Sequence, residues 1–126
     1  MMLRSRSNIA ALLCLLILVM PAAQASEEPP ELMGETVKIS EILDSVSDFQ
    51  GKMVVIEGKI EIECRSGCWF ILGDGTASIY VDLLPSGLVI PQKSGSDARV
   101  YGLVTTKDGE PMMIGKIVRI DGEIIR

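Results

Sequence analysis

The apolar residues of this chain change their spacing at Lys52, and this change limits the possible folds more than any other feature. Before it, over 38–49, apolar residues recur at intervals of three and four; they are Ile39, Ile42, Leu43, Val46 and Phe49. This spacing predicts one short amphipathic helix, with Ser40 available as its N-cap. After Lys52 the apolar period is two, the period of a half-buried strand. We therefore expect an all-β domain with one short N-terminal helix.

Five segments after Lys52 have the composition of strands and are separated by turn residues. We expect the strands at 53–64, 68–72, 78–83, 99–105 and 112–120. In the first strand, one face is expected to carry Val54, Ile56, Ile60, Ile62 and Cys64, and the other Glu57, Lys59, Glu61 and Glu63. The segment 85–96 is rich in Gly, Pro and Ser and predicts a connecting loop.

Three of the expected strands contain a glycine between apolar neighbours: Gly58, Gly102 and Gly115. An interior glycine weakens a flat strand, and it occurs where a strand bends sharply or lets another backbone approach. Such bends are needed at the corners of a small closed barrel. The pattern predicts a five-stranded oligonucleotide/oligosaccharide-binding (OB) fold over 37–126, with an open five-stranded meander as the alternative.

Two stretches also resemble a known superfamily. KISEILDSVSDFQGKMVVIEGKI (38–60) resembles the helix, Gly-Lys turn and first strand of OB-fold domains in the tRNA anticodon-binding-like superfamily, and CWFILGDGTASIYVD (68–82) resembles their second and third strands. The resemblance covers roughly 37–120. Exported bacterial and archaeal proteins of unknown function carry similar domains, often with a Cys-x-x-x-Cys-Trp segment like the one at 64–69. The resemblance implies an OB fold, with oligonucleotide binding through strands two and three as one function of that fold.

The first 25 residues have the pattern of a secretory signal peptide. Arg4 and Arg6 precede an apolar run of twelve residues, and Ala23-Gln24-Ala25 offers small residues for cleavage. The run is too short to span a bilayer, so we expect cleavage after Ala25, with an uncleaved anchor as the alternative. The exported protein would be secreted or periplasmic and would have no membrane span. Residues 26–36 contain four glutamates and two adjacent prolines, and they are expected to form a flexible acidic tether.

Charge and composition exclude several classes of function. The chain has 12 basic and 17 acidic residues; removing the first 25 residues removes two arginines, so the net charge becomes 10 − 17 = −7. This argues against nucleic acid as a ligand, because such binding depends on Lys and Arg displacing counterions from phosphates. The absence of histidine excludes imidazole-based triads and His-containing zinc sites. We expect no enzymatic activity and no cofactor. Asp74 lies in an Asp-Gly turn, and the turn explains this residue without a catalytic or metal-binding role.

Cys64 and Cys68 would remain as an even pair in a compartment where disulfides persist, since Cys14 leaves with the signal peptide. One cysteine ends the first expected strand and the other begins the second. Their Cβ atoms could therefore approach to the roughly 3.5–4.5 Å that a disulfide needs. A structural disulfide is the preferred interpretation. A metal site and a redox-active pair are the alternatives, although two thiolates supply only half of a tetrahedral set and the spacing is not Cys-x-x-Cys.

Trp69 and Phe70 are neighbours in a strand and must point to opposite faces. If Trp69 is the outer residue, it joins Tyr80 or Tyr101 on the face where OB folds bind ligands, so we expect a ligand-binding face containing Trp69, Tyr80 and Tyr101.

The preferred hypothesis is a non-catalytic exported binding module of the cell envelope, whose partner is a protein or small ligand. An oligonucleotide-binding domain, and a metal-binding or redox protein using Cys64 and Cys68, are the alternatives.

Overall fold

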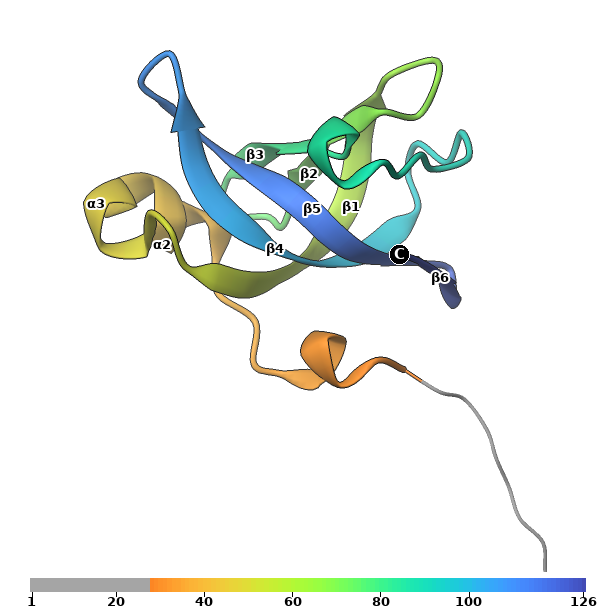
Figure 1. The fold of residues 1–126 in the computed structure, drawn as a ribbon, viewed down its shortest axis with the longest axis horizontal. Coiled ribbons are helices and arrows are strands. Elements are labelled where there is room, and N and C mark those ends of the chain that lie inside the picture. Colours follow the sequence, from red (N-terminus) through yellow and green to blue (C-terminus); the bar gives the residue numbers. More distant parts are fainter. Residues whose placement is uncertain (1–27) are drawn as a thin grey trace, which may run out of the picture.

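The computed structural model describes residues 28–126, so the predicted signal peptide over 1–25 lies outside the described residues. The strands that form the barrel are β1 (Met53–Glu63), β2 (Trp69–Gly73), β3 (Ser78–Asp82), β4 (Asp97–Lys107) and β5 (Glu110–Ile120). They are hydrogen-bonded in the order β3-β2-β1-β4-β5, and a parallel pairing of β3 with β5 closes the sheet (Figure 1). The predicted five-stranded OB barrel is therefore confirmed, and the open meander is excluded. Within 28–126, no helix is long and apolar enough to cross a membrane.

A sixth strand, β6 (Glu123–Ile125), was not predicted from the sequence. It pairs with the last residues of β5 through a turn at Asp121-Gly122, where both residues have positive φ, 51° and 86°. The turn Asp108-Gly109 between β4 and β5 has the same conformation, with φ of 56° and 83°. Asp-Gly is a favoured sequence for such two-residue hairpin turns because both positions require positive φ.

The three interior glycines lie where other chain segments come close. A Cβ atom at Gly58 would lie 2.7 Å from the carbonyl carbon of Gly73 on β2, and nearer still to the carbonyl oxygen. A Cβ at Gly102 would lie 2.8 Å from Met113 Cε and would overlap the carbonyl oxygen of Ile114 on β5. At Gly115 the nearest group is the side chain of Leu83, at 2.7 Å. These positions have no room for a side chain, as expected where strands cross closely in a small barrel.

The predicted single helix over 38–49 is divided into two, α2 (Ile39–Asp44) and α3 (Val46–Phe49). The break lies at Ser45, whose φ of −137° and ψ of 51° are not helical. Ser40 is not the N-cap, because the helix begins one residue earlier. Ile39 and Ile42 are fully buried and belong to the barrel core. The α2 helix thus covers one end of the barrel (Figure 1), and the 3-10 helix η3 (Leu84–Ser86) leads into Leu88 and Ile90, which are also part of the core.

The predicted inner face of β1 is wrong beyond Ile60. A bulge between Ile60 and Ile62 shifts the register against β2, from Ile60 opposite Leu72 to Ile62 opposite Ile71. Because a bulge adds one residue to one strand only, the side-chain alternation changes phase there. Ile62 is therefore 55% exposed instead of buried.

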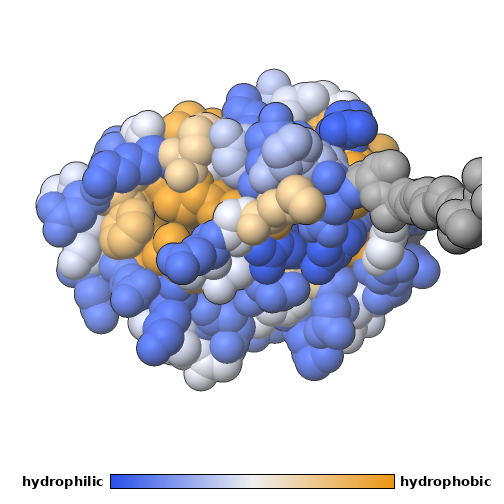
Figure 2. Space-filling model, turned by 90° about the horizontal axis from the view of Figure 1, so that it is seen from below, coloured by the Kyte–Doolittle hydropathy of each residue, from blue (hydrophilic) through white to orange (hydrophobic). Residues whose placement is uncertain are grey.

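The segment expected to be a flexible tether lies against the barrel in its described part. Residues 30–33 form the 3-10 helix η2 (Pro30–Met33), and Leu32 is fully buried. The Arg99 guanidinium donates to the carbonyl oxygens of Leu32 and Gly34, both at 2.6 Å. Arg119 donates to the Glu28 carboxylate at 2.6 Å. The composition predicted a tether because prolines and glutamates bury little surface, but two arginines on β4 and β5 hold this segment. Figure 2 shows this side of the molecule, where hydrophilic residues surround a hydrophobic patch toward the helical end.

Arg99→Ala should release the N-terminal segment while leaving the barrel folded. The variant loses two charge-assisted hydrogen bonds to the segment and a third to Glu57, from a side chain that is only 15% exposed, so we expect the free energy of unfolding to fall by about 1–3 kcal/mol. Hydrogen exchange of the amides at 31–36 should accelerate. Lys59→Ala is the control, because its ion pair with Asp97 is largely exposed and should change stability by less than about 0.5 kcal/mol. Unchanged exchange at 31–36 in Arg99→Ala would contradict this role.

Candidate functional site

The outer face of β2 and β3 carries a pair of stacked aromatic rings. Phe70 is fully buried in the core, so its neighbour Trp69 points outward. The pairing of β2 with β3 places Ile71 opposite Tyr80, and the rings of Trp69 and Tyr80 stack with centroids 5.2 Å apart and planes inclined by 24°. Both side chains are partly exposed. We call the surface around them the β2–β3 face.

Two thiols lie at one end of the β2–β3 face, in the turn between β1 and β2. Cys64 and Cys68 are free and partly exposed, and the Cys68 thiol donates to the Cys64 sulfur at 3.1 Å. The Ser66 hydroxyl lies 3.2 Å from the Cys64 sulfur and 3.6 Å from that of Cys68. Hydrogen bonds from the side chains of Ser66 and Cys68, supported by their backbone N–H groups, lower the pKa of Cys64 to about 6. A Cys64 sulfur in this setting is a thiolate at neutral pH.

The turn that carries the thiols is fixed by hydrogen bonds to the segment following β3. The amide of Gln92 donates to the carbonyl oxygens of Cys64 and Arg65, each at 2.9 Å. The backbone N–H of Ile90 donates to Gly67 at 3.0 Å, and that of Leu83 donates to Cys68 at 2.9 Å. These contacts hold the turn in place without a covalent link between the sulfurs.

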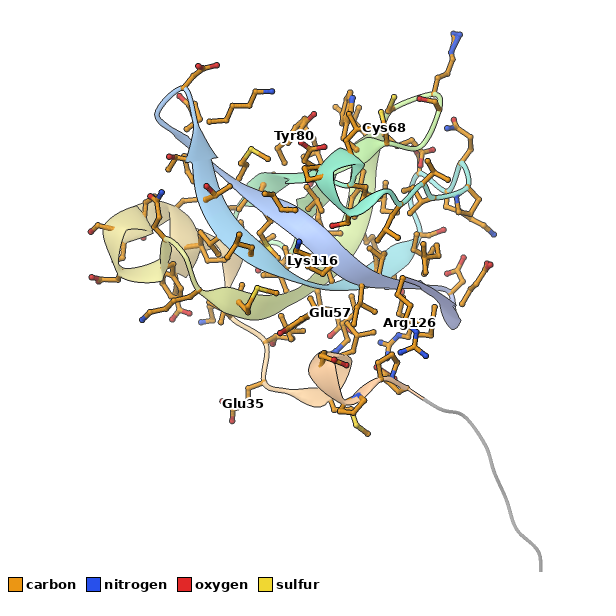
Figure 3. The ribbon with its side chains drawn as sticks, in the orientation of Figure 1. Glu35, Glu57, Cys68, Tyr80, Lys116 and Arg126 are labelled. Atoms are coloured by element: carbon orange, nitrogen blue, oxygen red, sulfur yellow. The ribbon has the colours of Figure 1, made fainter. Side chains whose placement is uncertain are left out.

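A shallow pocket of about 320 Å³ lies at the other end of the β2–β3 face. It is lined by Tyr80, Lys107, Asp108, Glu110, Pro111 and Met112. Met112 lies opposite Tyr80 in the parallel pairing of β3 with β5, so the pocket continues the surface of the aromatic stack to the β4–β5 turn. Figure 3 shows Cys68 and Tyr80 on one side of the barrel, and Glu57 and Glu35 on the opposite side.

Exposed apolar side chains lie close to the cysteine turn. Ile62, Leu84 and Val89 are 55%, 65% and 60% exposed, although residues of this kind are usually buried. Ile62 precedes the turn by two residues. Leu84 and Val89 adjoin Leu83 and Ile90, whose N–H groups bond to the turn. Three exposed apolar residues are therefore close in the chain to the cysteine turn or to the residues bonded to it.

The charge on the β2–β3 face is mainly negative. Burial raises the pKa of Tyr80, and negative charge on Asp82 and on the cysteine pair raises it further, so Tyr80 stays neutral. Asp82 lies opposite Trp69 in the β2–β3 pairing, and its carboxylate accepts a hydrogen bond from the Leu84 N–H at 3.1 Å. The face combines aromatic and aliphatic contact area with acceptor groups.

Tyr101 does not belong to this face, so the expected trio of aromatic residues is incomplete. It lies on β4 opposite Val55 of β1 and Ile117 of β5. In the sheet order, β1 separates β4 from β2, and the β1 residues that pair with β2 begin only at Lys59. Tyr101 therefore lies away from the stack of Trp69 and Tyr80.

Asp74 has a structural role at the start of α2. Its carboxylate accepts the Ile39 N–H at 2.8 Å, the Thr76 hydroxyl at 2.6 Å and the Thr76 N–H at 2.9 Å, and Thr76 in turn accepts the Ser40 N–H. Burial alone would raise the pKa of Asp74, but these hydrogen bonds lower it below its usual value. The Asp74 carboxylate thus caps the helix from another part of the chain.

A wider open groove of about 590 Å³ runs beside Gly58 and Gly73, but its acidic groups are already engaged. Asp97 accepts from Lys59 at 2.8 Å, Glu61 accepts from the Ser78 hydroxyl at 2.8 Å, and Asp74 caps α2. Across residues 28–126, no three His, Cys, Asp or Glu side chains are grouped in a way that would hold a metal ion. The β2–β3 face is the better candidate for a binding site.

No protein family model and no curated protein matches this sequence. Solved structures do match its fold. The hypothetical protein ygiW from E. coli is 18% identical over 77% of this chain and 99% of that one, with a TM-score of 0.50. Asparaginyl-tRNA synthetase from Pyrococcus horikoshii is 17% identical over 71% of this chain, with a TM-score of 0.57, and the match spans 23% of the synthetase. An OBody bound to hen egg-white lysozyme is 16% identical over 77% of this chain and 97% of its own, with a TM-score of 0.55. Because the sequence identities are low, these matches establish the OB fold alone.

Proposed function

We propose that this protein is a non-catalytic, extracytoplasmic OB-fold module that binds an extended polypeptide segment on the β2–β3 face. The main support is the stack of Trp69 and Tyr80 beside exposed Ile62, Leu84 and Val89. Exposed apolar surface marks interaction sites, and aromatic side chains commonly supply most of the binding energy there. The export signal expected over 1–25 is the reason for placing the module outside the cytoplasm.

The charge of the face favours a polypeptide over a nucleic acid. An oligonucleotide site of an OB fold combines stacking with basic side chains that contact phosphates. Here the stack has Asp82 and an anionic Cys64 beside it, and the cation at the other end, Lys107, lies next to Asp108 and Glu110. A neutral or cationic apolar peptide meets no such repulsion. The OBody of similar fold is bound to lysozyme, and this supports a protein ligand for the present barrel.

The test is a fluorescence titration, because Trp69 is the single tryptophan of the chain. The probes are a tryptophan-free peptide of alternating Val and Lys, and oligothymidylate as the competing ligand class. We expect the peptide to change Trp69 emission. Tyr80→Ala should weaken peptide affinity at least about tenfold, since truncating a central aromatic hot-spot contact costs about 2 kcal/mol or more and about 1.4 kcal/mol is a tenfold change.

Tyr101→Ala is the matched control, because Tyr101 is also a partly exposed strand tyrosine but lies away from the β2–β3 face. It should leave the peptide affinity unchanged. Tight, strongly salt-dependent binding of oligothymidylate without peptide binding would replace this proposal with the oligonucleotide-binding alternative. Equal losses in Tyr80→Ala and Tyr101→Ala would show that the peptide binds elsewhere.

A further inference from the structure

We infer that Cys64 and Cys68 form a thiol–disulfide exchange site that reacts with a disulfide carried by a polypeptide on the β2–β3 face. The inference rests on the proposed function for the identity of its partner, but the reactivity of the thiols does not depend on it. Such a site would make the module a redox-dependent binding protein.

The first support is the geometry of the two sulfurs. They lie 3.1 Å apart, so a bond of roughly 2.05 Å requires only a small movement of each side chain. The turn is already held by Gln92, Ile90 and Leu83 through backbone carbonyl groups. Because these hydrogen bonds do not involve the sulfurs, the same turn is compatible with the open and the closed pair. A bridge here is not needed to hold the turn, and the pair is free to cycle.

The second support is the division of roles between the thiols. Ser66 contacts the Cys64 sulfur at 3.2 Å, and the Cys68 S–H points at the same sulfur. Negative charge is therefore stabilised on Cys64, whose pKa is lowered to about 6, and the Cys68 S–H is the donor in the contact between the two sulfurs. A partly exposed thiolate beside a protonated thiol is the arrangement of a nucleophilic and a resolving cysteine.

The third support is the surface that surrounds the thiols. Ile62, Leu84 and Val89 are exposed around the turn, and Trp69 directly follows Cys68. A polypeptide that binds these apolar groups would bring a disulfide of its own within reach of Cys64. This is the reason for naming a polypeptide disulfide as the natural substrate.

The reaction balances as two exchanges. The Cys64 thiolate attacks one sulfur of the partner disulfide, the partner's S–S bond breaks, and one partner thiolate leaves. Cys68 then loses its proton and attacks the Cys64 sulfur of the mixed disulfide, which releases the second partner thiolate. The two cysteines are oxidised by two electrons and the partner disulfide is reduced. The Cys68 proton ends on one partner thiol, and the other partner sulfur leaves as a thiolate that takes its proton from water.

The test uses oxidised glutathione as the disulfide and peptide-level mass spectrometry of the reduced, purified protein at about pH 6.5. The wild type should form the Cys64–Cys68 bridge and release two glutathione molecules. Cys68→Ser should accumulate glutathione on Cys64, because the resolving thiol is absent. Cys64→Ser should react with glutathione at Cys68 at least about tenfold more slowly than Cys68→Ser reacts at Cys64.

Several results would overturn the inference. The first is a similar slow reaction with oxidised glutathione in both serine variants. The second is a wild type that keeps glutathione on Cys64 and does not form the Cys64–Cys68 bridge. The third is a bridge that excess reduced glutathione does not open, because such a bridge is purely structural. Serine is nearly isosteric with cysteine, and melting curves of the variants show whether each is folded. Wild-type protein that exchanges with oxidised glutathione but shows no change in Trp69 emission with the Val-Lys peptide would retain the exchange site and reject only the peptide-binding proposal. Failure of the exchange site and failure of the peptide-binding proposal are thus distinguishable.

Discussion

Gly58→Ala should destabilise the barrel by about 3 kcal/mol, the upper part of the range for inserting atoms into a packed site. The new Cβ would lie 2.7 Å from the Gly73 carbonyl carbon and would overlap the carbonyl oxygen. Both are backbone atoms of the paired strand β2, so they cannot move aside by changing a rotamer. For a domain of this size the loss corresponds to a decrease in melting temperature of more than about 10 °C. Thermal unfolding followed by circular dichroism measures it.

Gly34→Ala is the matched control. Gly34 has a φ of −73°, which any residue can adopt, and a Cβ there would meet nothing within 4 Å. Its melting temperature should therefore stay within a few degrees of the wild type. If Gly58→Ala melts together with Gly34→Ala, strands β1 and β2 do not approach as closely as described, and the barrel closes in another way.

Alkylation of Cys64 by iodoacetamide should rise with pH around a midpoint of about pH 6, instead of the value near 9.0 that an unperturbed thiol would show. The midpoint is the informative quantity, because a thiolate of low pKa is also a weaker nucleophile and the rate at one pH mixes the two effects. Ser66→Ala removes the largest contribution to the low pKa, and should move the midpoint upward. Peptide-level mass spectrometry over a pH series gives the midpoint for each cysteine.

The groups around the Cys64 sulfur determine the pH midpoint of its alkylation. The Ser66 hydroxyl lies 3.2 Å from it and the Cys68 S–H donates to it, while Tyr80 and Asp82 lie on the same surface and Tyr80 stays neutral. Ser47→Ala, on the exposed side of α3, is the control and should leave the midpoint unchanged. A Cys64 midpoint near that of an ordinary thiol would remove the chemical basis of the proposed exchange reaction.

The barrel could be predicted well from the sequence because two patterns each have one main structural cause. These patterns are the alternation of apolar and polar residues and the glycine inside a strand. Alternation places one face inside, and a glycine between apolar residues marks a close approach, as at Gly58 and Gly102. The bulge at Ile60–Ile62 was missed because no local residue signals the extra position, so Ile62 was assigned to the core. The break at Ser45 was missed for a similar reason, since the spacing of apolar residues continues across it.

Long-range hydrogen bonds explain the other differences. Composition predicted a tether over 26–36, but the carbonyl groups of Leu32 and Gly34 accept from Arg99, more than sixty residues away. Asp74 caps α2 from the β2–β3 turn, where the sequence offered Ser40 as a local cap. A linear pattern carries no signal for a donor and an acceptor that meet only after the barrel has closed.

The candidate site was predicted in part. Because Phe70 is in the core, strand alternation predicts that Trp69 points outward. The pairing of β2 with β3 brings Tyr80 next to Trp69. Tyr101 was included only because it is aromatic, and the sheet order places it elsewhere. Ser66 and Gln92, which tune and hold the cysteine turn, were not identified. The position of Ser66 between the two cysteines is the one signal that could have indicated its role.

The central claim is that ligands bind on the β2–β3 face, and amide chemical-shift mapping by NMR tests it most directly. The isotope-labelled protein is titrated with the alternating Val-Lys peptide. We predict that the perturbed amides cluster at 64–71, 78–82 and 107–112, which are the cysteine turn, the aromatic stack and the pocket beyond it. Perturbations concentrated instead at 53–57 and 99–103, around Tyr101 on the other side of the barrel, would contradict the account.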